Sequence, residues 1–520
     1  MQMWAFSFCL LIRALGIRPP VRQQILRYMP VSIQGLPMTK DETNSSPQIL
    51  WFRKDLRLSD NHALSAAIAS GRPIIPLYIR EPESSGNGPL GAAQAWWLHH
   101  SLDRLSKDIS RLGNKLILRS GPASSVLEAI IAECGAQAVY WNRRYDPSGI
   151  ETDKLLKATL VEKGVEVQSF AGQLLHEPSR LKTGGGTPYK VYTPFWRALE
   201  ASGEPRPPLD APDHIPALSK KLKSEELGDW GLLPKRPDWA ARFADIWSPG
   251  EAAAHEKLED FVSGRLAGYK DARDKPAEDG TSMLSPHLAL GEITPARIWH
   301  ATKGLRGVPA DDVITFRKEL AWRDFSYHLL FHNPEMASVN INRKYDSFPW
   351  RDDDDGFAVW TRGLTGYPIV DAGMRQLWIF GTMHNRVRMI AASFLIKDLL
   401  VDWRKGEAWF RDTLVDADPA SNAASWQWVA GSGADASPFF RIFNPILQGE
   451  KFDPKGDYVR RYVPEIAALP DKYIHRPFDA PPSVLEKAGV RLGDGYPKPV
   501  IDHSYARDRA LDALRSLNIE

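Results

Sequence analysis

The segment from 315 to 331 is expected to be a helix that carries four chemically active side chains on one face. Glu319, Trp322, Arg323 and Ser326 lie three or four residues apart in pairs, and such residues are neighbours on a helix surface. A carboxylate, an indole and a guanidinium together can line a polar, aromatic binding site. The spacing alone favours a plainer alternative, a solvated Glu319–Arg323 ion pair beside a core tryptophan.

A second helix, expected at 384–396, shows the same kind of pattern near its start. Asn385, Arg388 and Met389 share one side of this helix, and Arg386 flanks them. Two arginines and an amide at the beginning of a helix suit contact with phosphates or base edges. The pattern indicates a nucleotide or nucleic-acid site, although it is weak when taken alone.

The run from Asp416 to Trp428 (DADPASNAASWQW) combines two acids, an amide and two tryptophans in a stretch poor in large hydrophobic residues. We expect a loop here, and loops that carry such groups are often functional. The alternative is structural: Asp418 caps a helix, and Trp426 and Trp428 pack in the core.

Charge and cysteine content limit the classes of partner and site. The 520 residues include 66 basic and 64 acidic ones, a formal net charge of +2, so a basic surface for nucleic acid must be local. Cys9 and Cys134 are the only cysteines, too few for a disulfide framework, a structural zinc site or a four-thiolate cluster. We therefore expect no metal and a reducing, cytoplasmic location. No segment is apolar for long enough to cross a membrane.

From Gln48 onward, short apolar runs alternate with longer periodic ones, which is typical of a parallel sheet covered by helices. The sequence predicts an α/β fold for residues 47–178, a doubly wound parallel sheet of five strands. No GxGxxG motif comes after the first strand, so the usual glycine seat of a dinucleotide is missing. The expected strands are 49–53, 73–79, 115–120, 138–142 and 165–170.

Three further parts are expected in the chain. Residues 1–46 do not share the alternating pattern of the α/β part, and we interpret them as a disordered or spurious leader, with Met38 as an alternative start of translation. Residues 179–248 are rich in proline and charge and are expected to form a long interdomain linker. From 249 to 515 one helical pattern succeeds another, which predicts a larger all-α domain.

Eight sequence blocks occur in the order typical of the photolyase/cryptochrome family, which this chain resembles from about residue 50 to 510. The resemblance implies an N-terminal α/β antenna domain followed by a helical domain that binds FAD. Any one block alone would be unspecific, whereas eight long blocks in order are highly specific. The blocks are WFRKDLRLSDN (51–61), YKVYTPFW (189–196), GTSMLSPHLALGEITP (280–295), ELAWRDF (319–325), TGYPIVDAGMRQL (365–377), MHNRVRM (383–389), WQW (426–428) and FFRIFNPILQGEKFDP (439–454).

By resemblance, FAD is bound by hydroxyl-bearing and charged side chains of the helical domain. Residues 281–285 suit the cofactor's phosphates and ribityl chain, Arg388 and Asp416 match a pair beside the isoalloxazine, and Asn422 matches the side chain that faces its redox-active nitrogen. Phe316 stands where many relatives carry tryptophan, which keeps the packing and loses an indole donor. The implied FAD-binding residues are Tyr269, Thr281, Ser282, Met283, Leu284, Ser285, Phe316, Arg323, Asn385, Arg388, Asp416, Asp418 and Asn422.

The resemblance also implies UV-damaged DNA as a partner, with a flipped-out cyclobutane pyrimidine dimer as the substrate. Excited, reduced FAD gives an electron to the dimer, the ring splits and the electron returns. Aromatic walls and polar groups suit such a lesion, and Glu319 can donate a hydrogen bond or a proton to it. The implied lesion-binding residues are Arg273, Glu319, Trp322, Asn385, Arg386, Met389, Trp428 and Gln448.

Three further tryptophans match the family's electron-transfer chain, which reduces the flavin from the surface. They are Trp426, Trp403 and Trp350. Tryptophan is also a large hydrophobic residue, so the alternative for all three is core packing.

Within the family, the resemblance favours photolyases that split cyclobutane dimers, with class III nearest and class I close. The alternative is a cryptochrome-type photoreceptor, but Trp322, Met389 and Asn422 of the repair site are present. The histidine of (6-4) photolyases and the four cysteines of the iron–sulfur branch are missing. The nearest branch implies the antenna 5,10-methenyltetrahydrofolate near Trp96–Trp97 and the Lys54–Arg57 turn, while a deazaflavin or an empty site stays open. A monomer is expected.

Overall fold

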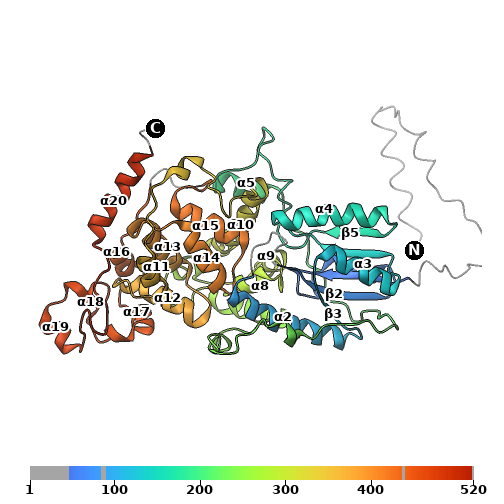
Figure 1. Cartoon of the computed structure of the whole chain (residues 1–520), viewed down its shortest axis with the longest axis horizontal. Helices are drawn as coiled ribbons and strands as arrows, with labels where there is room; N and C mark the ends of the chain where they lie inside the picture. Colours follow the sequence, from blue (N-terminus) through green and yellow to red (C-terminus); the bar gives the residue numbers. More distant parts are fainter. Residues whose placement is uncertain (1–45, 83–89, 436–439, 518–520) are drawn as a thin grey trace, which may run out of the picture. The chain divides into compact units, whose positions relative to one another are not determined.

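The computed structural model describes residues 46–82, 90–435 and 440–517, so the predicted leader lies outside the described residues except for Ser46. The N-terminal part is a five-stranded parallel sheet in the order β3-β2-β1-β4-β5 (Figure 1). The predicted strands are confirmed, with ends that shift by one or two residues. They are β1 (Gln48–Phe52), β2 (Ile74–Arg80), β3 (Ile117–Ser120), β4 (Ala138–Asn142) and β5 (Glu166–Phe170).

Helices cover both faces of the sheet, because alternate strand residues point to opposite sides. In the central strand β1, Leu50 and Phe52 pack on one face and Ile49 and Trp51 pack on the other. All five residues of β1 are buried, as expected for a strand covered on both sides. The first face is covered by α1 (His62–Ala69) and α2 (Ala92–Arg111), and the second by α3 (Ala123–Cys134) and α4 (Pro147–Glu162).

The turn after β1 joins the sheet to the helical part, and both belong to one compact unit, residues 45–520. Arg57 is 1% exposed, and its guanidinium donates to the backbone oxygens of Asp60, Gly172 and Gly291 at 2.9 to 3.0 Å. A Cβ atom on Gly291 would lie 2.1 Å from the Lys54 carbonyl oxygen, so only glycine permits this close approach. Arg57 is therefore a structural residue of this junction.

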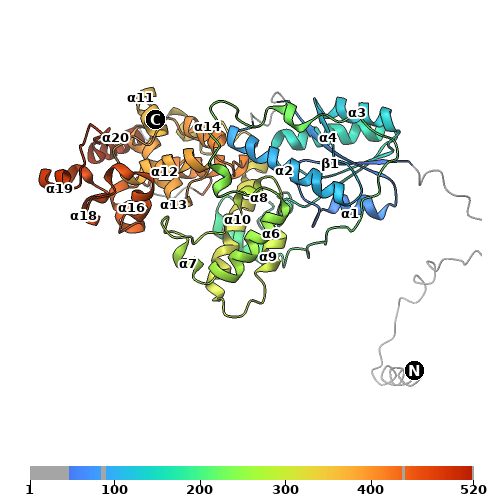
Figure 2. The same cartoon turned by 90° about the horizontal axis from the view of Figure 1, so that it is seen from below.

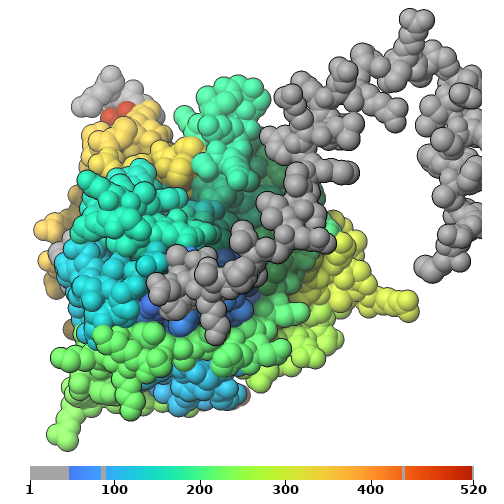
Figure 3. Space-filling view, turned by 90° about the vertical axis from the view of Figure 1, so that its right-hand side faces the viewer, coloured from blue at the N-terminus to red at the C-terminus, as the bar shows by residue number. Residues whose placement is uncertain are grey.

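Residues 179–248, expected to be a linker, contain a helix and run along the α/β part. The helix is α5 (Tyr192–Ala201), which buries one of its faces. Farther along, Leu118 N donates to Ser224 Oγ (3.0 Å) and Glu225 N donates to the Leu118 carbonyl oxygen (2.9 Å), so this segment covers the edge strand β3. Figure 3 shows the green stretch beside the cyan and blue segments. The domain and linker boundaries stay a prediction.

Beyond Gly250 the described residues form helices and connecting turns, as predicted (Figures 1 and 2). The helix expected at 384–396 is shorter, because α13 ends at Ser393 and a wide π turn continues to Asp398. In the described ranges, no helix is long and apolar enough to cross a membrane. The helices are α6 (Glu251–Asp260), α7 (Tyr269–Ala272), α8 (Ser285–Ala289), α9 (Pro295–Ala301), α10 (Ala310–His332), α11 (Asp354–Thr361), α12 (Pro368–Phe380), α13 (Asn385–Ser393), α14 (Trp403–Thr413), α15 (Pro419–Ala430), α16 (Pro445–Phe452), α17 (Asp457–Tyr462), α18 (Asp471–Ile474), α19 (Pro482–Lys487) and α20 (His503–Ser516).

The run from Asp416 to Trp428 is helical for most of its length, so the expected loop is wrong. Asp418 caps α15, since its carboxylate accepts from two backbone N–H groups of the first turn at 2.7 and 3.1 Å. Pro419 occupies the first helical position, and alanine, the best helix former, fills several positions after it. The structural alternative is therefore confirmed for two residues: Asp418 caps a helix, and Trp426 packs in the core, where it is 2% exposed.

Candidate functional site

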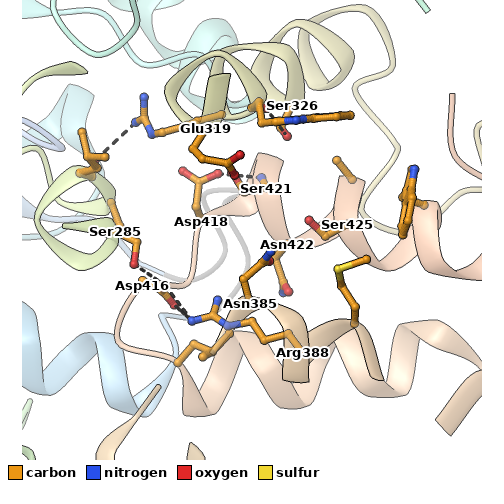
Figure 4. Close-up of a pocket in the computed structure, with 18 of the residues that line it drawn as sticks. Ser285, Glu319, Ser326, Asn385, Arg388, Asp416, Asp418, Ser421, Asn422 and Ser425 are labelled. Atoms are coloured by element: carbon orange, nitrogen blue, oxygen red, sulfur yellow. Dashed lines mark hydrogen bonds and ion pairs between the residues drawn. The ribbon is translucent and has the colours of Figure 1, made fainter. Parts of the chain in front are cut away.

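A cavity of about 790 Å³ opens between helices of the helical part, at the upper end of the range for ligand sites (Figure 4). Its side chains come from α7, α8, α10, α13, α15 and the turns beside them, so residues far apart in the sequence meet there. Every predicted FAD-binding residue lines this cavity, and so does every predicted lesion-binding residue except Gln448. The fold therefore gathers the separate sequence signals into one place.

One set of cavity residues is held by bonds to other protein groups, and we call it the anchored group: Arg388, Asp416, Asp418 and Asn422. Arg388 Nη2 donates to both carboxylate oxygens of Asp416 at 3.1 and 2.9 Å, and Ser285 Oγ donates to the same carboxylate at 2.7 Å (Figure 4). The Asp416 side chain is 5% exposed, and a buried carboxylate needs such partners. The Arg388 guanidinium is thus fixed at the cavity wall.

Asn422 is oriented by Glu407, a residue that the sequence did not single out. Asn422 Nδ2 donates to Glu407 Oε1 at 2.8 Å and to the Glu407 backbone oxygen at 3.0 Å. Because both partners are acceptors, the amide oxygen of Asn422 is left for the cavity. Burial raises the pKa of Glu407, while nearby Arg411 lowers it. The two residues lie on α14 and α15, so no helix-face pattern could pair them.

Asp418 and Arg323 line the cavity with much of their bonding capacity already used. Asp418 caps α15 and also accepts from Tyr327 Oη at 2.7 Å. Arg323 Nη1 donates to the Gln173 backbone oxygen at 2.7 Å, and its guanidinium lies 5.1 Å from the Tyr327 ring centre. Both side chains therefore stabilise the fold through bonds to other protein groups, and their contact with a cofactor stays a prediction.

A second set, which we call the aromatic group, consists of Arg273, Glu319, Trp322, Arg386 and Trp428. Glu319 forms an ion pair with Arg273, and Arg386 pairs with Asp274 at 2.8 Å. These four charged side chains are 20 to 34% exposed. The Glu319–Arg323 pair favoured by spacing is wrong, because Arg323 turns to another part of the chain. Asp274 directly follows Arg273, but nothing in the sequence marked it as a partner.

Two titratable groups of this region, Glu319 and His384, have shifted pKa values. Burial raises the pKa of Glu319, although Arg273 beside it lowers it in part. The Glu319 side chain is 31% exposed because it faces the open cavity, but protein surrounds it on its other sides. Burial lowers the pKa of His384 to about 4. A neutral ring fits its role, since His384 Nδ1 accepts from Arg386 N at the start of α13.

Three predicted residues, Gln448, Trp403 and Trp350, do not line the main cavity. Gln448 lines a neighbouring hollow of about 620 Å³, and Arg386 borders both spaces. Trp426 does line the main cavity. Trp403 is fully buried in the same hydrophobic cluster as Trp426, and half-buried Trp350 packs against that cluster. Trp350 is thus the most exposed of the three tryptophans.

Gly406 on α14 leaves room for the ring of Trp426. A Cβ atom on Gly406 would lie 2.2 Å from the Trp426 ring, a distance that no side chain could accommodate. The indole N–H of Trp426 is buried without a partner among the described residues, which is uncommon for a polar group.

Two protein-family models match the chain: "FAD binding domain of DNA photolyase" over residues 316–516 and "DNA photolyase" over residues 48–213. A deoxyribodipyrimidine photo-lyase of Agrobacterium fabrum is 64% identical over 474 residues, which cover 91% of this chain and 98% of that protein. The chain belongs to the photolyase/cryptochrome family.

Two further relatives extend the comparison within the photolyase/cryptochrome family. The crystal structure of a bacterial class III photolyase from Agrobacterium tumefaciens matches with a TM-score of 0.90 at 63% identity, and covers 92% of this chain and 98% of that chain. Cryptochrome-1 of Arabidopsis thaliana is 36% identical, over 90% of this chain and 70% of that protein. The predicted family and fold are confirmed.

The cavity of this photolyase-family chain fits FAD by the chemistry of its lining. Thr281, Ser282 and Ser285 offer hydroxyls, and Arg388 offers a fixed cation for an anionic ligand. Aromatic and aliphatic side chains supply the apolar surface that a flat ring system needs. Among the residues that the structure describes, no group of three or more His, Cys, Asp or Glu side chains is placed to bind a metal ion. The match to an FAD-binding domain, together with this lining, identifies FAD as the cofactor of the helical domain.

Proposed function

We propose that the chain is a deoxyribodipyrimidine photo-lyase that splits cyclobutane pyrimidine dimers in UV-damaged DNA by light-driven electron transfer. The observation that carries this proposal is a single cavity that combines the anchored group, suited to FAD, with the aromatic group, suited to a flipped-out pyrimidine dimer. The 64% identical Agrobacterium fabrum relative bears this name. By similarity to the 63% identical structure, we place the enzyme in class III.

In this mechanism, bound and reduced FAD supplies the electron under blue light. The chain's own residues bind, orient and exclude water. Trp322 and Trp428 form flat walls for the dimer, while Asn385 and Arg386 lie where base edges and the kinked backbone can be contacted. Arg388, held by Asp416, keeps its position without reorganisation when the ligand arrives.

Glu319 acts as the proton or hydrogen-bond donor in the proposed reaction. Its raised pKa means that it carries a proton at a higher pH than free glutamate does. A dimer in the cavity removes further water from this carboxylate, which favours the protonated form still more. Glu319 can then donate a hydrogen bond, or a proton, to a pyrimidine carbonyl oxygen on which negative charge develops.

We further propose that Trp426, Trp403 and Trp350 carry electrons from the surface to the flavin. Trp426 lies on the cavity wall with its N–H free of partners among the described residues. Trp403 is buried, with its indole nitrogen donating to Asn340 Oδ1 at 3.0 Å. The order of burial supports the proposed direction, since Trp350 is the most exposed of the three.

The proposed antenna is 5,10-methenyltetrahydrofolate near Trp96 and Trp97 on α2. Trp97 is fully buried and donates to Glu292 Oε1 at 3.1 Å. Trp96 is 7% exposed and has the rings of Phe243 and His100 at 5.4 and 4.5 Å. A folate absorption band in the purified protein, released on denaturation and identified by mass, tests this assignment. A monomeric state and a cytoplasmic location also stay predictions.

The deciding experiment is light-dependent reversal of a defined thymine dimer, with a (6-4) photoproduct measured alongside. We expect reversal of the dimer in blue light by the reduced enzyme, none in the dark, and none for the (6-4) product. Binding of FAD without reversal of either lesion would overturn the enzyme and favour a photoreceptor of the cryptochrome type.

A further inference from the structure

Tyr192, at the start of α5, stacks face to face on Trp322 of α10. The two ring centres lie 3.6 Å apart and the planes differ by 5°. Phe325 meets both rings edge-on, at 5.8 Å from each. One face of the Trp322 indole is thus covered by protein, while Trp322 lines the cavity and Tyr192 does not. The uncovered face of the indole is the one available to a ligand.

Hydrogen bonds hold Tyr192 in place at both ends. Its hydroxyl donates to the Lys318 backbone oxygen at 2.8 Å, which ties the ring to α10 one turn before Trp322. Its backbone N–H donates to Asp435 Oδ2 at 3.1 Å, and Asp435 itself lines the cavity. The residue is 8% exposed. Burial raises its pKa, so the phenol stays neutral. The stack is therefore anchored on two elements and cannot slide freely.

A half-buried indole without a backing ring could rotate about its side-chain bonds, and a wall that rotates binds a flat ligand poorly. A rigid, preset wall spares the ligand the cost of ordering it. We propose that Tyr192 is a positioning residue that fixes the plane of Trp322 for the dimer. This inference rests on the proposed function. It assigns no contact between Tyr192 and the lesion itself.

The test uses full-length enzyme with bound FAD and measures Kd for a dimer-containing duplex and for the same duplex undamaged. Tyr192→Leu removes the ring, and Tyr192→Met is a second variant that fills apolar space more flexibly. Tyr192→Phe keeps the ring and loses only the hydroxyl. Tyr189→Leu is the matched control, because Tyr189 lies on the same segment and its ring partners are Phe195 and His328 rather than Trp322. FAD content and Tm are measured for each variant.

We expect Tyr192→Leu and Tyr192→Met to weaken binding of dimer DNA by roughly two- to tenfold, the range that one aromatic stack accounts for. Binding of undamaged DNA, FAD content and the control variant stay near wild type, and Tyr192→Phe restores the preference for dimer DNA. In a Trp322→Ala background, Tyr192→Met adds no further loss, because the residue acts through the indole.

Three results would overturn the inference. One is an unchanged preference for dimer DNA in a folded, FAD-containing Leu or Met variant. Another is a loss in Tyr192→Phe as large as in Tyr192→Leu, and a third is additive effects of Tyr192→Met and Trp322→Ala. If Leu and Met both fail to fold, a lost preference for dimer DNA in a folded Tyr192→Phe variant overturns the inference, because that variant keeps the ring. A wild-type enzyme with no preference for dimer DNA contradicts the proposed function instead.

Discussion

The two groups that line the cavity differ in how their charged side chains are partnered. In the anchored group, the Asp416 side chain is 5% exposed and residue Asp418 is 7% exposed, and each carboxylate has at least two donors, while the Arg388 side chain is 26% exposed. In the aromatic group, the Arg273–Glu319 and Arg386–Asp274 pairs are 20 to 34% exposed. The carboxylates of the anchored group are therefore fixed in their bonds, whereas the ion pairs of the aromatic group can exchange their partners.

This difference matches two kinds of ligand. A cofactor that stays bound gains from groups fixed before it arrives, because little ordering cost remains. A DNA lesion arrives and leaves, so its site needs charges that can turn from a protein partner to a phosphate or base without leaving a buried charge unpaired. Partly exposed ion pairs are weak and meet that need.

The largest expected effect concerns Trp426, which lines the same cavity but belongs to neither group. Trp426→Phe should abolish most photoreduction of the bound flavin while repair by chemically reduced enzyme stays nearly normal, because phenylalanine keeps the packing and loses the electron donor. The measurement is the rate of flavin bleaching in light with an external reductant. Trp378→Phe is the control, since this residue is 54% exposed and lies outside the cavity. Normal photoreduction in Trp426→Phe would remove its role.

Asp416→Ala should break the anchored group. It leaves the Arg388 guanidinium without its carboxylate, and loss of charge-assisted bonds of this kind costs about tenfold or more in an equilibrium constant. We expect weaker FAD retention, measured as the ratio of flavin to protein absorbance after dialysis. Asp512→Ala, an exposed acid on α20, is the control. Full FAD content in Asp416→Ala would show that the cofactor does not depend on this pair.

The double variant Glu319→Ala/Asn385→Ala should affect the aromatic group and spare the anchored one. Each lost hydrogen bond to a ligand is worth roughly 1 kcal/mol, so the loss of two should lower dimer splitting in blue light about 30-fold at limiting substrate. FAD content should be unchanged in Glu319→Ala, and it is measured in the double variant as well because Asn385 is also an implied FAD-binding residue. The same two substitutions made singly show which residue dominates. Unchanged repair in the double variant would refute the assignment of the lesion site.

The smallest expected effect concerns His384, which caps α13 beside Arg386. Its pKa in the folded protein is about 4, below that of an unfolded histidine, so the unfolded chain gains a proton first as the pH falls below about 6.5. This residue therefore lowers stability between about pH 6.5 and 4, by about 2 kcal/mol between pH 7 and 5. His384→Asn keeps a capping side chain and should flatten the dependence of Tm on pH. An equally steep Tm curve in His384→Asn would contradict this.

Local patterns predicted more of the fold than of the side-chain pairing. The short apolar run of β1 and the helical spacing in α10 and α13 are properties of contiguous residues, and the structure confirms these elements. The run at 416–428 was misjudged because its polar residues outweighed the capping Asp418, Pro419 and the alanines that begin α15. The helix-start signal of Asp418 and Pro419 is present in the sequence, but the polar residues around it favoured a loop.

The residues predicted from the family pattern line one cavity, whereas residues that only the fold brings to them were missed. Glu407 orients Asn422 from a different helix, and Asp274 pairs with Arg386 across 112 residues of sequence. Glu319 takes Arg273 as its partner instead of Arg323, which lies one turn away on the same helix. A residue one turn away on the same helix is a possible ion-pair partner, but a residue from another element can lie closer to the charge.

By itself, the sequence determined the order of strands and helices, the family and the kinds of side chain at the site. These depend on short-range periodicity and on the identity of residues in ordered blocks. Only the tertiary structure decided which cavity residues are anchored, which remain partly exposed, and that Tyr192 backs Trp322. Such pairings arise when helices distant in sequence pack together, because a buried charge or ring is then satisfied by whichever group the packing brings within reach.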